Sequence, residues 1–294
     1  MPVTEIGWSA FFGRENLKSV CLYGVETLSG SSFVNCNNLE RLVLPDTLTA
    51  IQADVFSSDD NIREIIVDSA NPRYYSIDNC LIETQSKTLI LGGTQSIIPA
   101  DGSITKIGTK AFSGRLGLTQ ITIPDTITEI GEEAFSWCSF TQLEIPSSVK
   151  KIDSQVFSDC ADLSSLKLNY GLEEMGDMAF QGCTALTQVE IPSSVHSIGS
   201  IAFSGCTSLK SILLNEGLQN IGSGAFRGTA ITQIKIPASF TAIVSLYAYG
   251  LFSECEQLVS VTVDSGNQTY HSAGNCIIKT ATKTLTAGCN ASVI

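Results

Sequence analysis

A sequence motif of 22 or 23 residues that recurs along the chain constrains the fold more than any other feature of the sequence. Between residues 118 and 226 it occurs five times, and each copy places one aromatic residue at the same position. These residues are Phe135, Phe157, Phe180, Phe203 and Phe226. A unit this short cannot bury its own apolar face, so the units before and after must cover it. The period therefore predicts a solenoid of stacked, similar turns.

The fullest copy, residues 186–206, indicates what each unit forms. Residues 188–191 alternate polar and apolar side chains, which is typical of a strand with one buried side, and a proline ends the run. A second short extended segment near Ile198 and an inward turn at Ala202-Phe203 follow. No window keeps a helical period over three turns. We predict a β-rich solenoid, a right-handed stack of about ten such units.

The period is interrupted after residue 67. Phe56 and Phe112 are 56 residues apart instead of 23, which leaves 33 extra residues. Residues 80–83 and 88–91 are rich in apolar and β-branched side chains and are separated by four polar residues. These signals predict a β-hairpin within an insertion that spans residues 68–100.

The last part of the chain repeats this insertion. Residues 67–98 and 263–294 are identical at 16 of 32 aligned positions, so a second copy begins at residue 264 and is truncated. We therefore expect one solenoid domain over residues 1–294, which starts and stops inside a unit as a piece of a longer array would.

The amino-acid composition limits the kinds of molecule that this chain is expected to bind. The net charge is −12, from 29 acidic and 17 basic residues, which disfavours nucleic acid or an anionic lipid surface. A hydrophobic content of 43% with 16% charged residues is enough for a continuous core. No apolar run reaches the roughly eighteen residues that a membrane helix needs. The first residues, MPVTEIGW, lack the basic and apolar regions of a signal peptide.

Six of the ten cysteines occupy one position of the repeat, three residues after its phenylalanine. They are Cys36, Cys138, Cys160, Cys183, Cys206 and Cys255. This shared position predicts buried, free thiols that pack as small apolar groups. Disulfides between adjacent turns are the alternative, because neighbouring strands approach the permitted Cα separation. Cys21 alternates outward between Val20 and Leu22, so we expect a surface thiol there.

No residue pattern points to catalysis or to a bound metal or cofactor. His196 has no serine and acid at the spacing of a triad. The group Asp59-Asp60-Asn61 lacks the spacing of a calcium loop, and Gly92-Gly93 lacks the context of a phosphate loop and is expected to be a turn. A ladder of cysteine-bound metal would need further ligands, and the chain has only two histidines. We therefore expect no enzyme, no cofactor and no metal site.

The solvent-facing side of the predicted strands is the best candidate for a binding surface. Its polar residues are Gln120, Gln142, Glu144, Lys167, Gln188, Glu190, Gln233 and Lys235. We expect the alternating charges at 144, 167, 190 and 235 to form a ladder along the sheet. Such a ladder either stabilises the sheet through cross-strand pairs or presents a strip that binds a protein. Both interpretations stay open.

The phrase L-x-x-I-x-I-P-x-x-V-x-x-I-G-x-x-A-F-x-x-C at residues 186–206 resembles the BspA-type leucine-rich repeat. The phrase V-D-x-x-N-x-x-Y at residues 67–74 and 263–270 is similar to the extended repeats of that family. Departures are local: Asp59, Arg115 and Thr229 replace the cysteine, and Asn169 and Asn215 replace the proline.

The resemblance implies a bacterial or protozoan protein at the cell surface or secreted, which recognises a host or bacterial protein and adheres to it. It implies no catalytic residues. An architectural spacer without a ligand of its own is the alternative function. Self-association is also expected to be possible, because the exposed turns at the two ends could pair with another copy.

Overall fold

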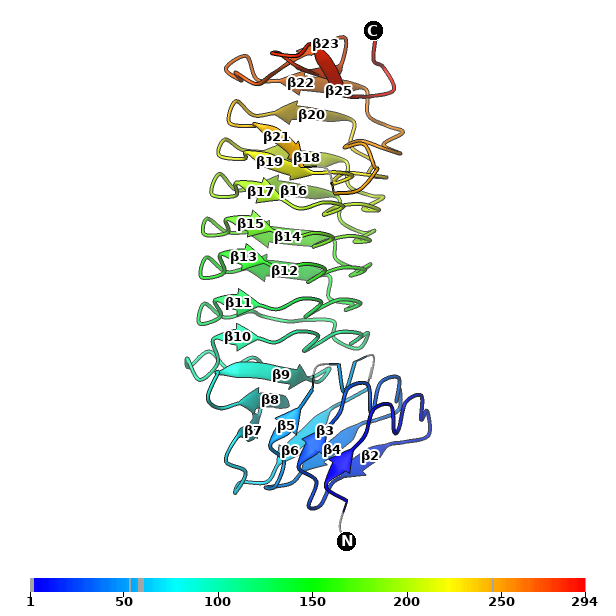
Figure 1. Cartoon of the computed structure of the whole chain (residues 1–294), viewed down its shortest axis with the longest axis vertical. Helices are drawn as coiled ribbons and strands as arrows, with labels where there is room; N and C mark the ends of the chain where they lie inside the picture. Colours follow the sequence, from blue (N-terminus) through cyan, green and yellow to red (C-terminus); the bar gives the residue numbers. More distant parts are fainter. Residues whose placement is uncertain (1–2, 53, 58–60, 245, 294) are drawn as a thin grey trace. The chain divides into compact units, whose positions relative to one another are not determined.

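The computed structural model describes residues 3–52, 54–57, 61–244 and 246–293. It divides into two compact units, Met1–Phe140 (unit 1) and Thr141–Ile294 (unit 2). The described residues form strands and turns with no helix, so none of them builds a helix that could cross a bilayer. Each unit is a β-solenoid, as the repeat predicts (Figure 1). That the whole chain is one solenoid domain stays a prediction.

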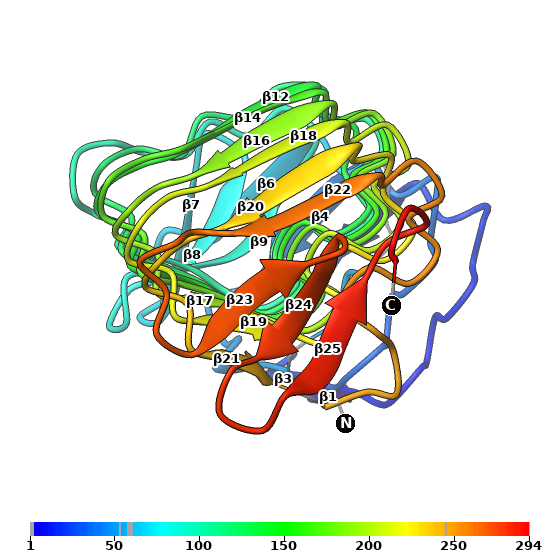
Figure 2. The same cartoon turned by 90° about the horizontal axis from the view of Figure 1, so that it is seen from above.

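In unit 2 each turn contributes a face strand of four residues on one side and a shorter strand on the other (Figure 2). The face strands are β12 (Gln142–Ile145), β14 (Ser165–Leu168), β16 (Gln188–Ile191), β18 (Ser211–Leu214), β20 (Gln233–Ile236) and β22 (Ser260–Val263). The short strands are β13 (Lys151–Ile152), β15 (Glu174–Met175), β17 (Ser197–Ile198), β19 (Asn220–Gly222) and β21 (Ala242–Val244). The short strands pair in parallel with one another, turn after turn.

Unit 1 follows the same plan on either side of the insertion. Its face strands are β2 (Ser19–Cys21), β4 (Arg41–Leu44) and β6 (Glu64–Val67), which form one parallel sheet. Its short strands are β1 (Glu5–Ile6), β3 (Thr27–Leu28), β5 (Ala50–Ile51), β10 (Lys106–Ile107) and β11 (Glu129–Ile130). Strands β1, β3 and β5 pair in that order, and β10 pairs with β11.

The repeat phenylalanines form the core of each unit. In unit 2 the rings of Phe157, Phe180 and Phe203 are fully buried and stacked, with centroids 5.2 and 5.4 Å apart. In unit 1 Phe112 and Phe135 stack at 5.0 Å. Residues in the left-handed region lie two positions before and two positions after each phenylalanine from Phe112 to Phe226, as Ile201 (φ 60°) and Gly205 (φ 73°) do around Phe203, which turns the chain tightly inward.

The insertion is a three-stranded antiparallel meander, one strand larger than the predicted hairpin. It consists of β7 (Tyr74–Ile77), β8 (Cys80–Glu83) and β9 (Thr88–Gly92). Strand β9 then pairs in parallel with β10, so the insertion itself supplies one level of the short-strand stack. Its second copy is β23 (Tyr270–Ala273), β24 (Cys276–Lys279) and β25 (Thr284–Gly288). The turn predicted at Gly92-Gly93 begins only at Gly93, whose carbonyl accepts from Ser96 N–H at 3.3 Å, while Gly92 is the last residue of β9. Residue 92 must be glycine because a Cβ there would overlap the Phe112 ring.

The cysteines of the repeat are buried, as predicted. The thiols of Cys36, Cys138, Cys183, Cys206 and Cys255 each donate to the phenylalanine carbonyl of the preceding turn, for example Cys206 Sγ to Phe180 O at 3.2 Å and Cys255 Sγ to Phe226 O at 2.9 Å. Contact with Cys206 and burial together raise the pKa of Cys183 well above the ordinary thiol value. Cys21 is exposed, as expected. The thiols of the repeat cysteines are therefore part of the packed core.

Arg115 takes the place of a cysteine at the junction after the insertion. Its side chain is fully buried and donates to three carbonyl groups: Nη2 to Phe56 O at 2.9 Å, Nε to Gly92 O at 3.0 Å and Nη1 to Ser113 O at 3.1 Å. The phenylalanine carbonyl that a cysteine would reach lies 59 residues back in sequence here. The arginine side chain, which is longer than a cysteine, thus connects three segments: the turn before the insertion, strand β9 and the turn that contains Arg115.

Candidate functional site

The outward side of the face strands in unit 2 is polar, as the alternation predicts. Strands β12, β16, β18 and β20 each alternate exposed and buried residues. The predicted face residues of unit 2 are all exposed: Gln142, Glu144, Lys167, Gln188, Glu190, Gln233 and Lys235. Gln120 is also exposed, but it belongs to unit 1 and lies in a segment without a strand.

The charges on this face form the ladder that the alternation predicts only in part. Lys167 Nζ lies 2.7 Å from Glu144 Oε1, directly across the β12–β14 pair. Glu190 instead accepts a hydrogen bond from the Asn215 amide at 3.0 Å. Lys235 Nζ pairs with Asp264 Oδ2 at 2.7 Å. The predicted ladder is thus confirmed at its first step, Glu144 to Lys167, whereas Glu190 and Lys235 each contact a residue that follows the end of the next strand in the sequence.

These contacts favour the ionised form of each group. Hydrogen bonds from Lys167 and Asn169 hold the pKa of Glu144 below its ordinary value. The carboxylate of Asp264 raises the pKa of Lys235, and Lys235 in turn lowers the pKa of Asp264. The pairs are exposed to solvent, so each contributes little to the free energy of unfolding. Their charges stay available to a partner.

The face of unit 2 is divided into separate two-stranded sheets. Strands β12 and β14, β16 and β18, and β20 and β22 form four-residue parallel ladders, whereas β14 and β16 belong to different sheets. In each pair the second strand is followed by Asn169, Asn215 or Asp264, and at each break the second strand is followed by Pro192 or Pro237. Asp264 donates its backbone N–H to the last residue of β20 at 2.8 Å. Proline has no N–H, so it cannot close the ladder at this position.

A groove of about 530 Å³ lies on the predicted face across the break between β14 and β16, and its lining extends onto β18. Its lining includes Lys167, Gln188 and Glu190 of the predicted set. It also includes Leu213, an outward position of the predicted face that is 51% exposed, and Tyr170, which the sequence interpretation missed and which is 72% exposed. An exposed aromatic and an exposed aliphatic side chain beside charged groups resemble the composition of protein interfaces.

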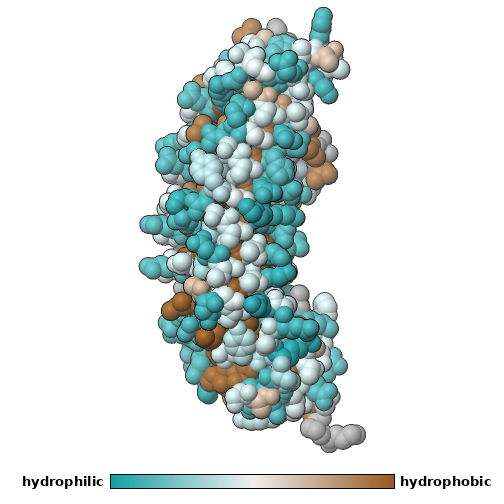
Figure 3. Space-filling view, turned by 90° about the vertical axis from the view of Figure 1, so that its left-hand side faces the viewer, coloured by the Kyte–Doolittle hydropathy of each residue, from teal (hydrophilic) through white to brown (hydrophobic). Residues whose placement is uncertain are grey.

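The edge of the molecule seen in Figure 3 has a different character. Hydrophilic residues cover most of that view, and hydrophobic surface is confined to small separate patches. Large contiguous apolar patches mark interaction sites on soluble proteins, and that view shows none.

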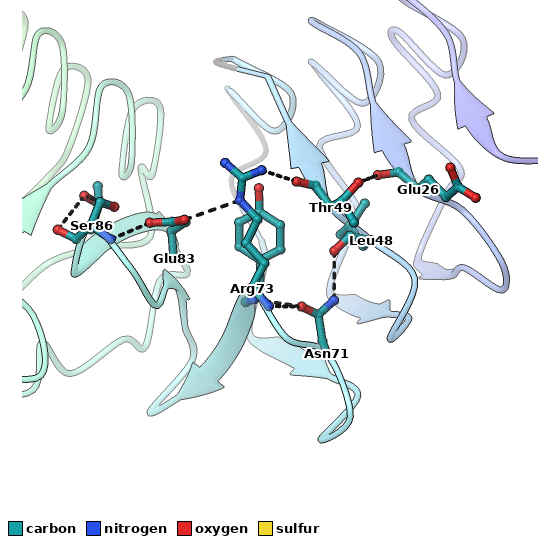
Figure 4. A network of polar contacts seen from close by, with 9 residues as sticks. Glu26, Leu48, Thr49, Asn71, Arg73, Glu83 and Ser86 are labelled. Atoms are coloured by element: carbon teal, nitrogen blue, oxygen red, sulfur yellow. Dashed lines mark hydrogen bonds and ion pairs between the residues drawn. The ribbon is translucent and has the colours of Figure 1, made fainter.

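A second polar cluster fixes the insertion in unit 1 (Figure 4). The Asn71 side-chain amide donates to Pro45 O at 2.7 Å and Leu48 O at 3.0 Å, and its oxygen accepts from the backbone N–H groups of Arg73 and Tyr74. Arg73 Nε in turn lies 3.3 Å from Glu83 Oε1. Because the partners of Asn71 are backbone groups of the preceding turn and of its own loop, the cluster is a structural clamp.

The other candidate residues for catalysis or metal binding that the structure describes do not form a common site. His196 Nε2 lies 3.3 Å from Glu174 Oε1 on an exposed surface. Within the described ranges no group of three or more His, Cys, Asp or Glu side chains could hold a metal ion. Asp59 and Asp60 lie outside the described residues. Nothing in the described geometry therefore assigns a catalytic role.

Three solved structures resemble this chain over most of its length, and at these identities they establish the fold alone. A leucine-rich repeat protein from Bacteroides ovatus is 22% identical, with a TM-score of 0.58 and coverage of 85% of this chain and 63% of that one. One from Eubacterium ventriosum is 19% identical, with a TM-score of 0.64 and coverage of 82% and 78%. The pneumococcal vaccine antigen PcpA is 15% identical, with a TM-score of 0.56 and coverage of 90% and 72%.

The chain thus spans less than two thirds of the Bacteroides ovatus protein. A comparison with curated proteins gave no match. The family model described as BspA type Leucine rich repeat region (6 copies) matches residues 1–91, 94–200 and 173–292. These matches extend over nearly the whole sequence, including both copies of the insertion. The chain belongs to the BspA-type leucine-rich repeat family.

Proposed function

We propose that this chain is a surface-exposed adhesion module that recognises a host or bacterial protein through the face strands of unit 2. The observation that carries the proposal is the groove between β14 and β16, where Tyr170 and Leu213 stand exposed beside Lys167 and Glu190. Buried aromatic anchors surrounded by polar groups supply most of the affinity of protein interfaces. Leucine-rich repeats form scaffolds for such contacts, and one similar structure is a vaccine antigen.

The partner is expected to be an extracellular protein. The overall charge of −12 disfavours nucleic acid, whereas a groove with both signs of charge suits a mixed protein surface. Since Lys167 and Glu190 are exposed, they would guide the encounter and respond to salt, while Tyr170 and Leu213 would supply the anchor. Cell-surface or secreted localisation is part of the same proposal.

A displayed library of extracellular domains from bacteria and animal hosts provides the test. Domains selected on the natural chain are measured again on the double variant Tyr170→Ala/Leu213→Ser. We expect binding to weaken by about 30-fold or more, which corresponds to about 2 kcal/mol. The matched control is Tyr23→Ala, because Tyr23 is 81% exposed but belongs to unit 1. If every selected domain binds the double variant as tightly as the natural chain, the groove is not the binding site.

Charge reversal separates this function from the alternative of an architectural spacer. The internal pairs Glu144–Lys167 and Lys235–Asp264 favour the spacer, because they can be explained by sheet stability alone. Reversing Glu144, Lys167, Glu190 and Lys235 together should weaken a genuine complex, and should reduce its dependence on salt. The fold should survive, since exposed pairs contribute little each. Unchanged binding by the folded variant would favour the spacer.

A further inference from the structure

Glu190 is a charged residue on the face strands of unit 2 that the described residues leave without an opposite charge. It accepts a hydrogen bond from the neutral amide of Asn215 at 3.0 Å, and no described lysine, arginine or histidine forms an ion pair with it. Lys167, which lines the same groove, is held by Glu144 at 2.7 Å. The carboxylate of Glu190 is therefore available to a cation from a partner.

The pairing of the face strands explains why Glu190 has no cation beside it. Lys167 and Glu190 occupy the same position of the repeat, 23 residues apart, but their strands β14 and β16 belong to different sheets. Lys167 instead lies opposite Glu144 in the closed pair β12–β14. The residue opposite Glu190 in its own pair β16–β18 is Leu213, which has no charge. The strand register thus gives Glu190 an aliphatic neighbour and no ion pair.

The groove that contains Glu190 also offers apolar surface. The inward residues of β14, Leu166 and Leu168, are partly exposed, whereas the inward residues of β12 are buried. Both leucines line the groove together with the exposed side chains of Leu213 and Tyr170. Alkyl side chains, an aromatic ring and a carboxylate without an ion pair are therefore found in the same groove.

We propose that the protein partner inserts a cationic side chain, arginine rather than lysine, into this groove; the inference rests on the proposed function. The alkyl stem of that side chain would pack against Leu166 and Leu213, while its guanidinium donates to the carboxylate of Glu190. The electron-rich face of the Tyr170 ring would attract the same cation. Arginine fits better than lysine, because a planar guanidinium stacks on aromatic rings and presents several donors. A groove of about 530 Å³ is larger than one side chain, so residues beside the arginine enter it as well.

The charge of the chain favours a basic partner. The net charge of −12 attracts a positively charged surface and repels a negatively charged one before contact is made. Lys167 does not replace the partner's cation, because a move toward Glu190 would break its contact with Glu144, which a hydrogen bond from Asn169 also holds in position. The cation is therefore expected from the partner, and binding should weaken at high salt.

A pair of short peptides tests the inference without the natural partner. The acetylated and amidated pentapeptide Gly-Leu-Arg-Leu-Gly is titrated into the whole chain, with isotope-labelled leucine methyl groups, up to about 10 mM, which detects Kd values of millimolar order. The matched probe is the same peptide with citrulline, which has nearly the shape of arginine but no charge. We expect saturable shifts of the Leu166, Leu168 and Leu213 methyl signals, and a Kd at least about tenfold weaker for the citrulline peptide, which corresponds to about 1.4 kcal/mol. Equal Kd values for the two peptides, or no shift of these signals, would overturn the inference.

Two variants test whether the preference for arginine depends on Glu190. Glu190→Gln should remove the difference between the two peptides. Glu256→Gln, which changes the net charge equally at another exposed position of unit 2, should preserve it. A preference for arginine that survives Glu190→Gln would contradict the proposed contact.

The selected domains keep this inference separate from the proposed function. Domains whose binding the double variant Tyr170→Ala/Leu213→Ser weakens are measured on Glu190→Gln, where we expect a loss of at least about tenfold in affinity. If these domains bind Glu190→Gln as tightly as the natural chain, the inference of a cationic side chain fails while the groove remains the binding site. If no domain responds to the double variant, the proposed function fails, and the two peptides alone decide whether the groove binds a cation.

Discussion

The two copies of the insertion share 16 of 32 aligned residues and yet are held in different ways. Both form a three-stranded meander, and in both an asparagine, Asn71 or Asn267, bonds two carbonyls of the preceding turn and two N–H groups of its own loop. In the first copy Arg73 Nε also lies 3.3 Å from Glu83 Oε1. In the second copy the positions of that pair hold threonine and lysine.

The difference shows which features of a meander depend on its own sequence and which depend on the strands packed against it. The turn residues and the buried alternation are common to both copies, so both make the same strands in the same register. Burial is not common to both: β8 is buried along its whole length, whereas β24 becomes exposed toward its end. Stability in a solenoid is a sum of each unit and its interfaces, so equal units can contribute unequally.

The largest expected effect is at Arg115. Arg115→Ala leaves the carbonyls of Phe56, Gly92 and Ser113 without their guanidinium donor and opens a cavity in unit 1. We expect a loss of about 3–6 kcal/mol of unfolding free energy, measured by urea denaturation followed by circular dichroism. Cys206→Ala, which removes one thiol–carbonyl contact, should cost only about 1–2 kcal/mol. Equal losses would show that Arg115 does not hold the junction.

Truncating the two matching leucines tests the burial difference directly. Leu89→Ala removes a fully buried side chain and should cost about 2–5 kcal/mol. Leu285→Ala removes one that is 44% exposed and should cost less than about 1 kcal/mol at a protein concentration low enough to prevent association. The two variants are compared by urea denaturation under identical conditions. Similar losses would mean that β25 is as well covered as β9.

The shared clamp should instead behave alike in both copies. Asn71→Ala and Asn267→Ala each remove one amide that makes four hydrogen bonds to the backbone. We expect each to cost about 1–3 kcal/mol and to accelerate amide exchange in its own meander. Hydrogen exchange measured by mass spectrometry assigns the loss to residues 74–92 or 270–288. Faster exchange in both meanders from either single variant would contradict separate clamps.

Much of the fold could be predicted from the sequence because the same residue pattern occurs in many successive units. The bounds of β8 agree with the prediction, and those of β9 differ by one residue. Strand β7 was missed because polar residues interrupt its apolar pattern. A signal for it exists: Asp78 and Asn79 join β7 to β8 with φ of 48° and 59°, and these residue types favour such two-residue hairpin turns.

The candidate site was only partly predictable. Period-two alternation identifies the outward residues correctly, because it depends on the strand alone. The partner of each charge depends on which strands pair, and in unit 2 proline follows the second strand at each break. The substitution of Asn169 and Asn215 for proline is visible in the sequence, but the resulting groove with Tyr170 needs the three-dimensional arrangement.

The smallest expected effect concerns Glu83, which only the first copy has. Hydrogen bonds from Ser86, aided by Arg73, hold the pKa of Glu83 below its ordinary value. Its stabilising contribution is therefore present above the unfolded-state pKa and is lost as the pH falls from about 5 through the folded-state pKa. Arg73 is half exposed, so we expect the contribution to stay below about 1 kcal/mol. Urea midpoints measured between pH 7 and pH 3 for the natural chain and Glu83→Gln provide the measurement. The variant should lose part of the acid dependence, whereas Lys279→Gln in the second copy should leave it intact. If Glu83→Gln and the natural chain show the same pH dependence, the contact between Glu83 and Ser86 adds nothing to the stability of the first meander.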